Sequence, residues 1–553
     1  MRKSIGALIA IMMVMGLVAA CAAPVDAPVT GATPAPEAGY SPAGQGRGDV
    51  EDAARPGPSE EGAPMRGGTL VFAPTSEGVG PIGLPWDLAP ADFALVQPFT
   101  HGLTAQALDG STVLTLSAGY TVGRDETRGE NGLYFVEHTL HQGIYLHPHF
   151  LNPAEKVNAS LIEWLAGRVL YYSAWPSGMI YVEATGEYTV RFYWDHMRNA
   201  TPSMTTAWVT SREIYEYGGP ELLADTPVSA GPFRVVEYVR GSHVLYERFD
   251  NYFQEGRPYL DGVHMVFLGD TLVQNIALQT EGEGRVDVVA TNTAEQGGTF
   301  SDLGYTILMM PNQTIVIVPP NDDPDNPLAH PLVRQAISMA IDRHTITEAL
   351  GFGIHRPTYQ HIPPGFGARN PDPNYGVPGF GLARARELMA EAGFADGFHS
   401  TLLPRPGSVT ASQAVALGHQ LQDIGISTEI VILDAVSFTE MRRETGWDGI
   451  LVCNFISWFQ PEDSGRINFQ HIEGLLPNWV SMVPTDRMNE LIDAAFFFGD
   501  NIAEVMELSD YMLDNLHIIP LWHQGNMHIV HPRIAGTLPE DHMLVFYRLW
   551  INE

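Results

Sequence analysis

The first 65 residues of this 553-residue chain have a composition that excludes them from a folded core. Arg2 and Lys3 precede an uncharged, mostly apolar run at 5–20, which is short for a membrane-spanning helix and typical of a signal peptide. Residues 22–65 are dominated by Ala, Pro, Gly and acidic residues, so they cannot bury enough surface to fold. We therefore expect a signal peptide at 1–20, a disordered linker at 21–65 and a folded body of about 490 residues.

Cys21 stands directly after the apolar run, in the string Val18-Ala19-Ala20-Cys21. This string resembles a bacterial lipobox, whose cysteine is acylated and becomes the first residue of the mature protein. Acyl chains on Cys21 would anchor the protein in a bilayer, and the linker would let the body stand off from it. We predict a lipid-anchored protein outside the cytoplasmic membrane, in the periplasm or at the cell surface. An ordinary signal peptide with an incidental cysteine is the alternative.

Charge and composition narrow the possible functions of the body. The formal net charge of −34 argues against nucleic acid as a partner. Only Lys3 and Lys156 are lysines, so lysine-based catalysis would depend on Lys156 once the leader is removed. Cys453 lies in an apolar run and is predicted to be a small buried core residue, which leaves no cysteine pair for an intrachain disulfide.

The sequence lacks the common catalytic motifs of secreted hydrolases. It contains no Gly-x-Ser-x-Gly elbow and no His-Glu-x-x-His pair. A pair of catalytic carboxylates remains open, but no spacing selects one. We therefore predict that the protein is not an enzyme and needs no cofactor, and we keep a secreted hydrolase as a remote alternative.

Hydrophobic periodicity predicts a mixture of strands and helices. Alternation and buried apolar runs predict strands at 67–73, 133–140, 188–194, 426–433 and 447–455, and a hairpin at 231–248. Helical spacing predicts helices at 160–171, 332–350, 382–392 and 412–423, with one or two more in 487–516. Such a mixture indicates an α/β protein with at least two lobes, and a crevice between lobes is the usual place for a small ligand.

Several segments, in order along the body, resemble family 5 extracellular solute-binding proteins, which are the oligopeptide-, dipeptide- and nickel-binding proteins of ABC importers. The strings SAGPFRV at 229–235 and YERFDNYF at 246–253 resemble the block written GTGPYK…LERNPDYW in that family. Further matches are PYLDGV at 258–263, GRVDV at 284–288, PLVRQAI…AIDR at 331–343, ARARELMAEAG at 383–393 and the helix-to-strand junction at 421–426. Each match is short, and their shared order makes the resemblance specific.

The resemblance implies a two-lobed α/β fold of the periplasmic-binding-protein type II kind, with an extra inserted domain. It places lobe 1 in three pieces, 66–85, 206–325 and 516–553, the inserted domain at 86–205 and lobe 2 at 326–515. It also implies that a monomer captures a small solute by hinge closure and delivers it to the membrane subunits of an ABC transporter. A peptide is the leading ligand class, and an oligosaccharide or other non-peptide ligand is the alternative. A binding protein that serves as a sensor or chaperone is a third possibility.

The resemblance also points to ligand-binding residues after the strand at 447–455. In peptide-binding members a tryptophan follows this strand, and an aspartate three residues later holds the amino group of the peptide. Here the tryptophan is Trp458, but Pro461 stands where that aspartate is expected. Either Glu462 or Asp463 takes over the role, or the ligand has no ammonium group there.

Aromatic residues complete the predicted ligand site. Phe459, beside Trp458, is predicted to stack on the ligand, with a core position as the alternative. Trp86 lies in a Gly- and Pro-rich loop that lines the cleft in the family, and the alternative is that its ring packs on its own loop. Asn321 is interpreted as part of the hinge.

Four histidines, His138, His141, His147 and His149, raise the question of a metal site. The spacing of His147 and His149 is not that of a standard ligand pair, and His138 belongs to an alternating strand. The family usually has a histidine-containing turn near His147. We therefore predict no metal site.

Overall fold

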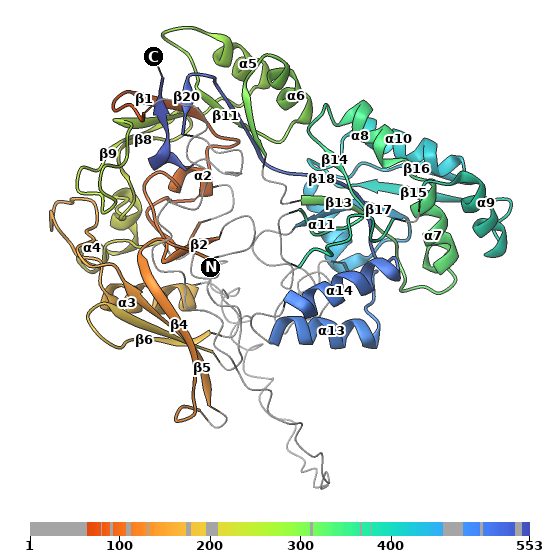
Figure 1. The fold of residues 1–553 in the computed structure, drawn as a ribbon, viewed down its shortest axis with the longest axis horizontal. Helices are drawn as coiled ribbons and strands as arrows, with labels where there is room; N and C mark the ends of the chain where they lie inside the picture. Colours follow the sequence, from red (N-terminus) through yellow and green to blue (C-terminus); the bar gives the residue numbers. More distant parts are fainter. Residues whose placement is uncertain are drawn as a thin grey trace, which may run out of the picture. The chain divides into compact units, whose positions relative to one another are not determined.

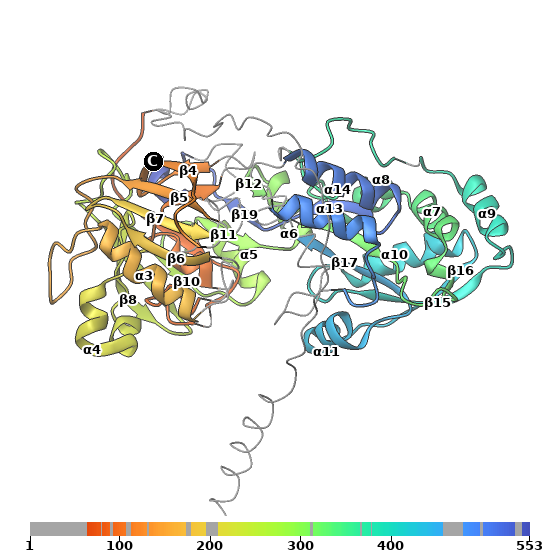
Figure 2. The ribbon, with the colours of Figure 1, turned by 90° about the horizontal axis from the view of Figure 1, so that it is seen from below.

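A computed structural model describes residues 63–552, apart from 79, 89–91, 107–111, 130–131, 173–178, 195–207, 310–312, 365–367, 378, 457–478, 498–501 and 537–544. Residues 44–553 form one compact unit, which contains every described residue. Three sheets of four or more strands organise this part of the chain (Figures 1 and 2).

The first of these is a mixed seven-stranded sheet. In spatial order its strands are β12 (Thr306–Met309), β19 (Met527–Val530), β11 (Val288–Thr291), β1 (Thr69–Ala73), β10 (Gly262–Val266), β9 (His243–Arg248) and β8 (Phe233–Val239). Strand β1 pairs in parallel with β10 and β11, and the other pairs are antiparallel. Its alternating side chains face two cores, one of which is closed by α5 (Thr271–Gln279) and α6 (Ala294–Asp302).

The second sheet has six strands and helices on both faces. In spatial order its strands are β14 (Arg356–Pro357), β18 (Ile519–Gln524), β13 (Gln313–Val318), β17 (Ile450–Ile456), β15 (Phe398–Pro404) and β16 (Ile426–Ile430). One face packs against α7 (Pro331–Ala340), α9 (Leu382–Glu391) and α10 (Ala411–Gln422), and the other against α13 (Asp486–Phe497) and α14 (Ile502–Asp514). Burial on both faces explains why β13 and β17 are almost continuously apolar.

Two connections carry the chain between these sheets. Strand β12 of the seven-stranded sheet leads to β13 of the six-stranded sheet, and β18 leads back to β19. Strands β13 and β18 lie within the ranges predicted for lobe 1, yet they pair with each other and with strands of 326–515. The physical reason is that each side of these strands faces one of the two cores of the six-stranded sheet. The division into domains otherwise remains a proposal.

The third sheet contains the strands β4 (Ser117–Asp125), β5 (Leu133–Leu140), β7 (Thr189–Trp194) and β6 (Met179–Ala184), all paired antiparallel. Helix α3 (Ala159–Tyr172) and helix α4 (Arg212–Asp225) share its hydrophobic core. Ser211 caps α4 by accepting a hydrogen bond from the backbone N–H of Ile214.

The single helix predicted at 332–350 is wrong, because the chain forms two helices there. Helix α7 ends at Ala340, and α8 (Arg343–Leu350) begins after Asp342, which leaves the helical conformation and caps α8 through Thr345 N. The apolar spacing runs through the break because both helices bury residues in the same core.

No helix among the described residues combines the length and apolar character needed to cross a membrane.

Candidate functional site

The main predicted ligand residues follow strand β17. This strand ends at Ile456, and Trp458, Phe459, Glu462 and Asp463 lie in 457–478, outside the described residues. Their role in ligand binding stays a prediction. The neighbourhood of this segment is described on both sides, because β17 leads into it and Trp479 follows it.

Aromatic rings pack where the two ends of this segment meet the six-stranded sheet. The ring of Phe455 lies 5.5 Å from that of Trp479 and 4.7 Å from that of His361. Burial, followed by the charge of Arg369, lowers the pKa of His361 to about 3. His361 is therefore a neutral ring at physiological pH.

Asn321 holds the chain just after the same segment. Its side-chain amide donates to the carbonyl of Val483 at 2.9 Å, and its side-chain oxygen accepts from the Val483 N–H. Its own backbone N–H donates to Ser481 O at 2.8 Å. These bonds give Asn321 a structural role in holding 481–483, and its predicted part in the hinge is not tested by them.

Two arginines, Arg405 and Arg442, lie near enough to Cys453 of β17 to act on its thiol electrostatically. Arg405 follows β15, and its backbone N–H donates to Val452 O at 2.8 Å. Burial, and the positive charges of Arg405 and Arg443, lower the pKa of Arg442 to about 10, against the opposing effect of Cys453. Among the ion pairs of the described residues, none involves Arg405 or Arg442. Among the described residues, these arginines therefore form no ion pair with a carboxylate, in a chain whose net charge is −34.

Sequence reasoning missed this arginine pair. Arg405 follows β15 and Arg442 lies in the segment Met441–Thr445, and only tertiary structure brings both within electrostatic reach of Cys453. No pattern in the sequence signals that they form no ion pair with an acid of the described residues.

Cys453 is fully buried in the core on one face of the six-stranded sheet, as predicted. Burial raises the pKa of its thiol to about 12, although Arg405 and Arg442 act in the opposite direction. A thiol with such a pKa is not a nucleophile at neutral pH.

Trp86 belongs to an aromatic cluster on the core of the third sheet. Its ring meets Trp164 of α3 at 6.4 Å and Tyr215 of α4 at 5.8 Å, both edge to face. The guanidinium of Arg168 lies over both partner rings, 4.3 Å from Trp164 and 4.4 Å from Tyr215. Trp86 thus packs on the two helices, which differs from packing on its own loop. Its predicted contact with ligand stays a prediction.

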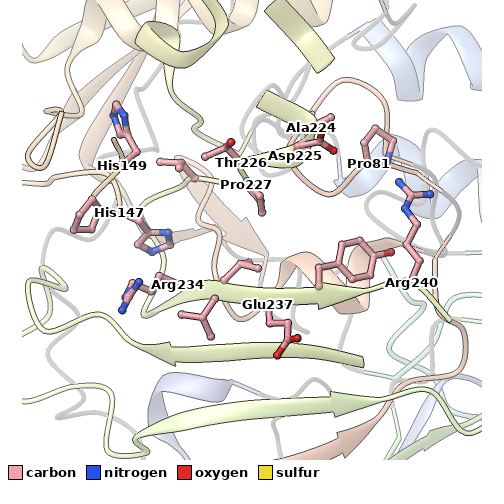
Figure 3. Close-up of a pocket in the computed structure, with 15 residues that line it drawn as sticks. Pro81, His147, His149, Ala224, Asp225, Thr226, Pro227, Arg234, Glu237 and Arg240 are labelled. Carbon is pink, nitrogen blue, oxygen red and sulfur yellow. The ribbon is translucent and has the colours of Figure 1, made fainter. Parts of the chain in front are cut away.

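A pocket of about 440 Å³ lies between 147–149, 224–228 and strand β8 (Figure 3). Its lining carries both signs of charge, with Asp225 and Glu237 opposed by Arg234 and Arg240. Trp86, the predicted ligand residue that the structure describes, is not among its lining residues. Such a mixed, polar lining does not by itself select a ligand.

Two of the four histidines considered as metal ligands, His138 and His147, are buried. Burial lowers the pKa of His138 on β5 and of His147 to about 4. His147 accepts from Ser229 N at 3.3 Å and donates to Gly231 O at 3.0 Å, so it ties its loop to the entry of β8. This is a structural role.

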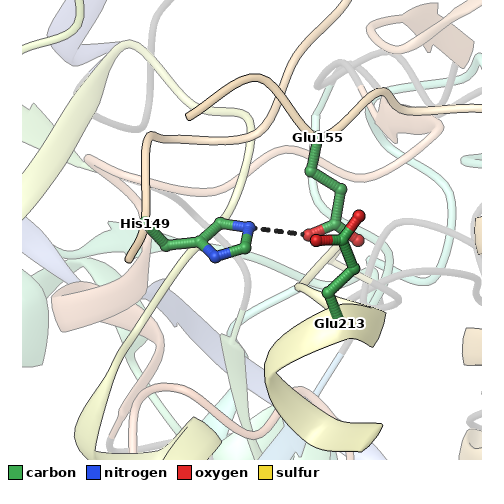
Figure 4. Close-up of side chains that lie close together, drawn as sticks. All are labelled: His149, Glu155 and Glu213. Atoms are coloured by element: carbon green, nitrogen blue, oxygen red, sulfur yellow. Dashed lines mark hydrogen bonds and ion pairs between the residues drawn. The ribbon is translucent and has the colours of Figure 1, made fainter. Parts of the chain in front are cut away.

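His149, in contrast, lies beside two glutamates that are distant in the sequence (Figure 4). Its Nε2 is 2.9 Å from Glu155 Oε2, and an oxygen of Glu213, from the first turn of α4, lies nearby. One ligand atom from each of the three residues lies within 4.8 Å of the other two. The prediction of no metal site considered only the histidines.

Two connected sheets with helices on their faces are the architecture of a two-lobed solute-binding protein. The sequence model of the bacterial extracellular solute-binding proteins, family 5 Middle, matches residues 153–471, more than half of the chain. The chain therefore belongs to this family, which confirms the predicted resemblance.

Individual relatives are more distant. The glutathione-binding protein GsiB of Salmonella typhi is 26% identical over 349 residues, which cover 62% of this chain and 65% of that protein. The match thus spans slightly less than two thirds of the relative's length.

Solved structures share the fold. The periplasmic binding protein DppA from Helicobacter pylori, in complex with the peptide STSA, has a TM-score of 0.67 at 16% identity, covering 88% of this chain and 99% of that one. AgaA from A. tumefaciens R10, in complex with agropinic acid, has a TM-score of 0.65 at 20% identity, covering 88% and 99%. These likenesses confirm the predicted two-lobed type II fold.

Proposed function

We propose that this protein is an extracytoplasmic binding lipoprotein, anchored through Cys21, that captures a small solute and delivers it to an ABC transporter. Membership of the solute-binding family supports capture outside the cytoplasm. The leader, Cys21 and the linker support the anchor. The protein works as a monomer that binds without turnover.

Capture occurs by hinge closure. The two connections, β12 to β13 and β18 to β19, support this because a few residues at strand ends are the usual hinges of two-lobed proteins. The ligand binds across both lobes in the closed state only, so it shifts the equilibrium toward closure.

The ligand carries a carboxylate group, and a peptide is the leading class. The observation that carries this is the pair Arg405 and Arg442, which both act electrostatically on Cys453 of β17 and form no ion pair with an acid among the described residues. Arginine binds carboxylates through two parallel hydrogen bonds, and a ligand carboxylate would offset the repulsion between the two cations. The ligands named for the relatives above, glutathione, the peptide STSA and agropinic acid, are all carboxylic acids.

A non-peptide ligand is the second candidate. AgaA is described in complex with agropinic acid, so a protein of this fold accepts a ligand other than a peptide. Pro461, at the position where peptide binders have an aspartate, favours a ligand without an ammonium group there. An oligosaccharide would use Trp458 and Phe459 but not the arginines.

The test compares ligands that differ in one group. Ligand-free protein is titrated with short peptides, with the same peptides amidated at the C-terminus, and with oligosaccharides, and its thermal unfolding is followed. A peptide at 100 times its Kd stabilises the protein by about 2.7 kcal/mol, and amidation removes most of that gain. Equal stabilisation by both forms would contradict a role for the arginines. Turnover of any candidate would contradict a pure binding function.

Three variants locate the site in the same assay. Arg405→Gln and Arg442→Gln lose most of the carboxylate-dependent stabilisation, and Trp458→Ala loses most of the stabilisation by any ligand while remaining folded. The matched control is Arg386→Gln on α9, which packs on the opposite face of the six-stranded sheet. If Arg386→Gln loses as much carboxylate-dependent stabilisation as Arg442→Gln, the loss reflects a general effect of positive charge and contradicts a specific role for Arg442.

A further inference from the structure

Glu155 is a buried carboxylate with few partners. Its side chain is 8% exposed and that of His149 is 0% exposed. Glu155 Oε2 accepts from Ser211 Oγ at 2.5 Å and lies 2.9 Å from His149 Nε2. Among the described residues, neither Arg nor Lys forms an ion pair with Glu155.

Glu213 brings a second carboxylate to the same place. One of its oxygens, Oε1, accepts from the side-chain amide of Asn152 at 2.9 Å. In the part of the chain that the structure describes, its side chain also has no Arg or Lys partner. Two carboxylates side by side repel each other, and no Arg or Lys among the described residues pairs with either of them. A divalent cation would offset both.

We propose that His149, Glu155 and Glu213 bind one divalent transition-metal ion, of which Zn²⁺ is the best fit. One imidazole nitrogen with two carboxylate oxygens is a donor set that Zn²⁺ accepts, whereas Ca²⁺ prefers oxygen alone. Bonds of about 2.0–2.2 Å in a tetrahedron place ligand atoms about 3.4 Å apart. The three atoms, all within 4.8 Å of one another, reach this spacing by small side-chain rotations.

The ion requires two local changes. Asn152 N–H donates to His149 Nδ1 at 3.4 Å, so the proton of the neutral ring lies on Nε2, 2.9 Å from Glu155 Oε2. A neutral imidazole that binds metal through Nε2 carries its proton on Nδ1, so both hydrogen bonds are released on binding, and two bonds to the ion replace the one between His149 and Glu155.

The bound ion cross-links two segments that are far apart in the sequence. His149 and Glu155 belong to the loop between β5 and α3, and Glu213 belongs to the first turn of α4. In the proposed division into domains, this joins the inserted domain to lobe 1. The role is structural, and it does not depend on the ligand proposed above, since none of those ligand residues takes part.

The experiment is a calorimetric titration of chelator-treated, full-length protein with ZnCl₂, with CaCl₂ as a second arm. We expect one equivalent of Zn²⁺ to bind and to raise the melting temperature, with much weaker binding of Ca²⁺. Glu213→Gln retains an amide oxygen for Asn152 and binds Zn²⁺ at least about tenfold more weakly. His149→Gln loses the rise in melting temperature.

The matched control is Glu216→Gln, on the same turn region of α4, which removes the same charge from an exposed residue paired with Arg212. It should bind Zn²⁺ like the wild type. Equal Zn²⁺ affinities of wild type and Glu213→Gln, or an absence of stoichiometric binding, would overturn the proposal. If all variants bound Zn²⁺ and Ca²⁺ equally, the calorimetric signal would come from the acidic surface in general, and this result would also overturn the proposal.

Discussion

The guanidinium of Arg168 lies over the rings of Trp164 and Tyr215, and the ring of Trp86 contacts both rings edge to face. A guanidinium over two aromatic faces is held by its charge and by stacking, which are strongest where water is kept out. The ring of Trp86 covers part of this arrangement. At the scale of single residues, Trp86 therefore contributes to stability whether or not it touches a ligand.

We expect Trp86→Ala to lower the free energy of unfolding by about 2 kcal/mol, because it opens a half-buried aromatic contact with two rings. Urea denaturation of the ligand-free protein measures this. Trp86→Phe keeps an aromatic ring and should retain most of the stability. If Trp86→Phe is stable but loses the stabilisation by ligand, the predicted ligand contact is supported, and an unchanged stability of Trp86→Ala would contradict the packing role.

Single residues also show where sequence reasoning stops. Cys453 could be placed in the core because its neighbours are apolar. The roles proposed for Arg442 and Glu213 could not be recognised, because they depend on what surrounds these residues in space. An arginine without an acidic partner among the described residues, or two glutamates at one imidazole, is a property of tertiary packing. The ligand residues at 457–478 were proposed from the family resemblance, and they remain untested.

A break of two residues, 341–342, separates helix α7 from helix α8. Asp342 accepts from Thr345 N at 3.0 Å and Thr345 Oγ1 at 2.7 Å, and so satisfies donors at the start of α8. Arg343, the first residue of α8, is buried and donates to Pro520 O and Ser338 O. The break therefore belongs to the core and is more than a local irregularity.

We expect Asp342→Ala to lower the free energy of unfolding by about 1 kcal/mol, because α8 loses its cap. Asp342→Asn keeps an oxygen acceptor and should remain within about 0.5 kcal/mol of the wild type. Equilibrium denaturation checks both variants. Equal losses for Ala and Asn would show that the charge of Asp342, and not the cap, matters.

Helices and strands with a regular hydrophobic period were predicted well. Elements that form only because a neighbouring strand pairs with them were not predicted. Strand β5 and helix α10 match their predicted ranges within one residue, since alternation and helical spacing fix them locally. Strand β14 has only two residues and exists because β18 lies beside it. At Gly231, a β-carbon would lie 2.3 Å from the Phe99 carbonyl carbon, so this glycine of the family block is required by a neighbour far away in sequence.

Buried neutral histidines are spread over the whole molecule. Burial lowers the pKa of a set of them to about 3 or 4, among them His138, His147, His361, His523 and His528. In the unfolded chain a histidine titrates near 6.5. Between these values the unfolded chain takes up protons that the folded protein excludes, so the stabilisation is complete above about pH 6.5 and is lost as the pH falls toward 4.

We expect stability to fall steeply between pH 7 and pH 5, by up to about 1.4 kcal/mol per pH unit for each such histidine. Urea denaturation across this range measures the slope. His138→Gln should reduce the slope, whereas the same change at the exposed His344 is the matched control and should leave it unchanged. A stability that does not vary with pH would contradict this account.

The two connections between the sheets also govern when the chain can fold. Strand β19 lies between β11 and β12, and β18 lies between β13 and β14. Neither sheet can form completely until residues 519–530 are available to pair. Pairing of strands that are hundreds of residues apart is slow, because a long loop must close first. A chain whose residues 519–530 have not yet emerged from the ribosome therefore cannot complete either sheet. Such a delay suits a polypeptide that is threaded through a membrane as an extended chain and assembles only on the far side.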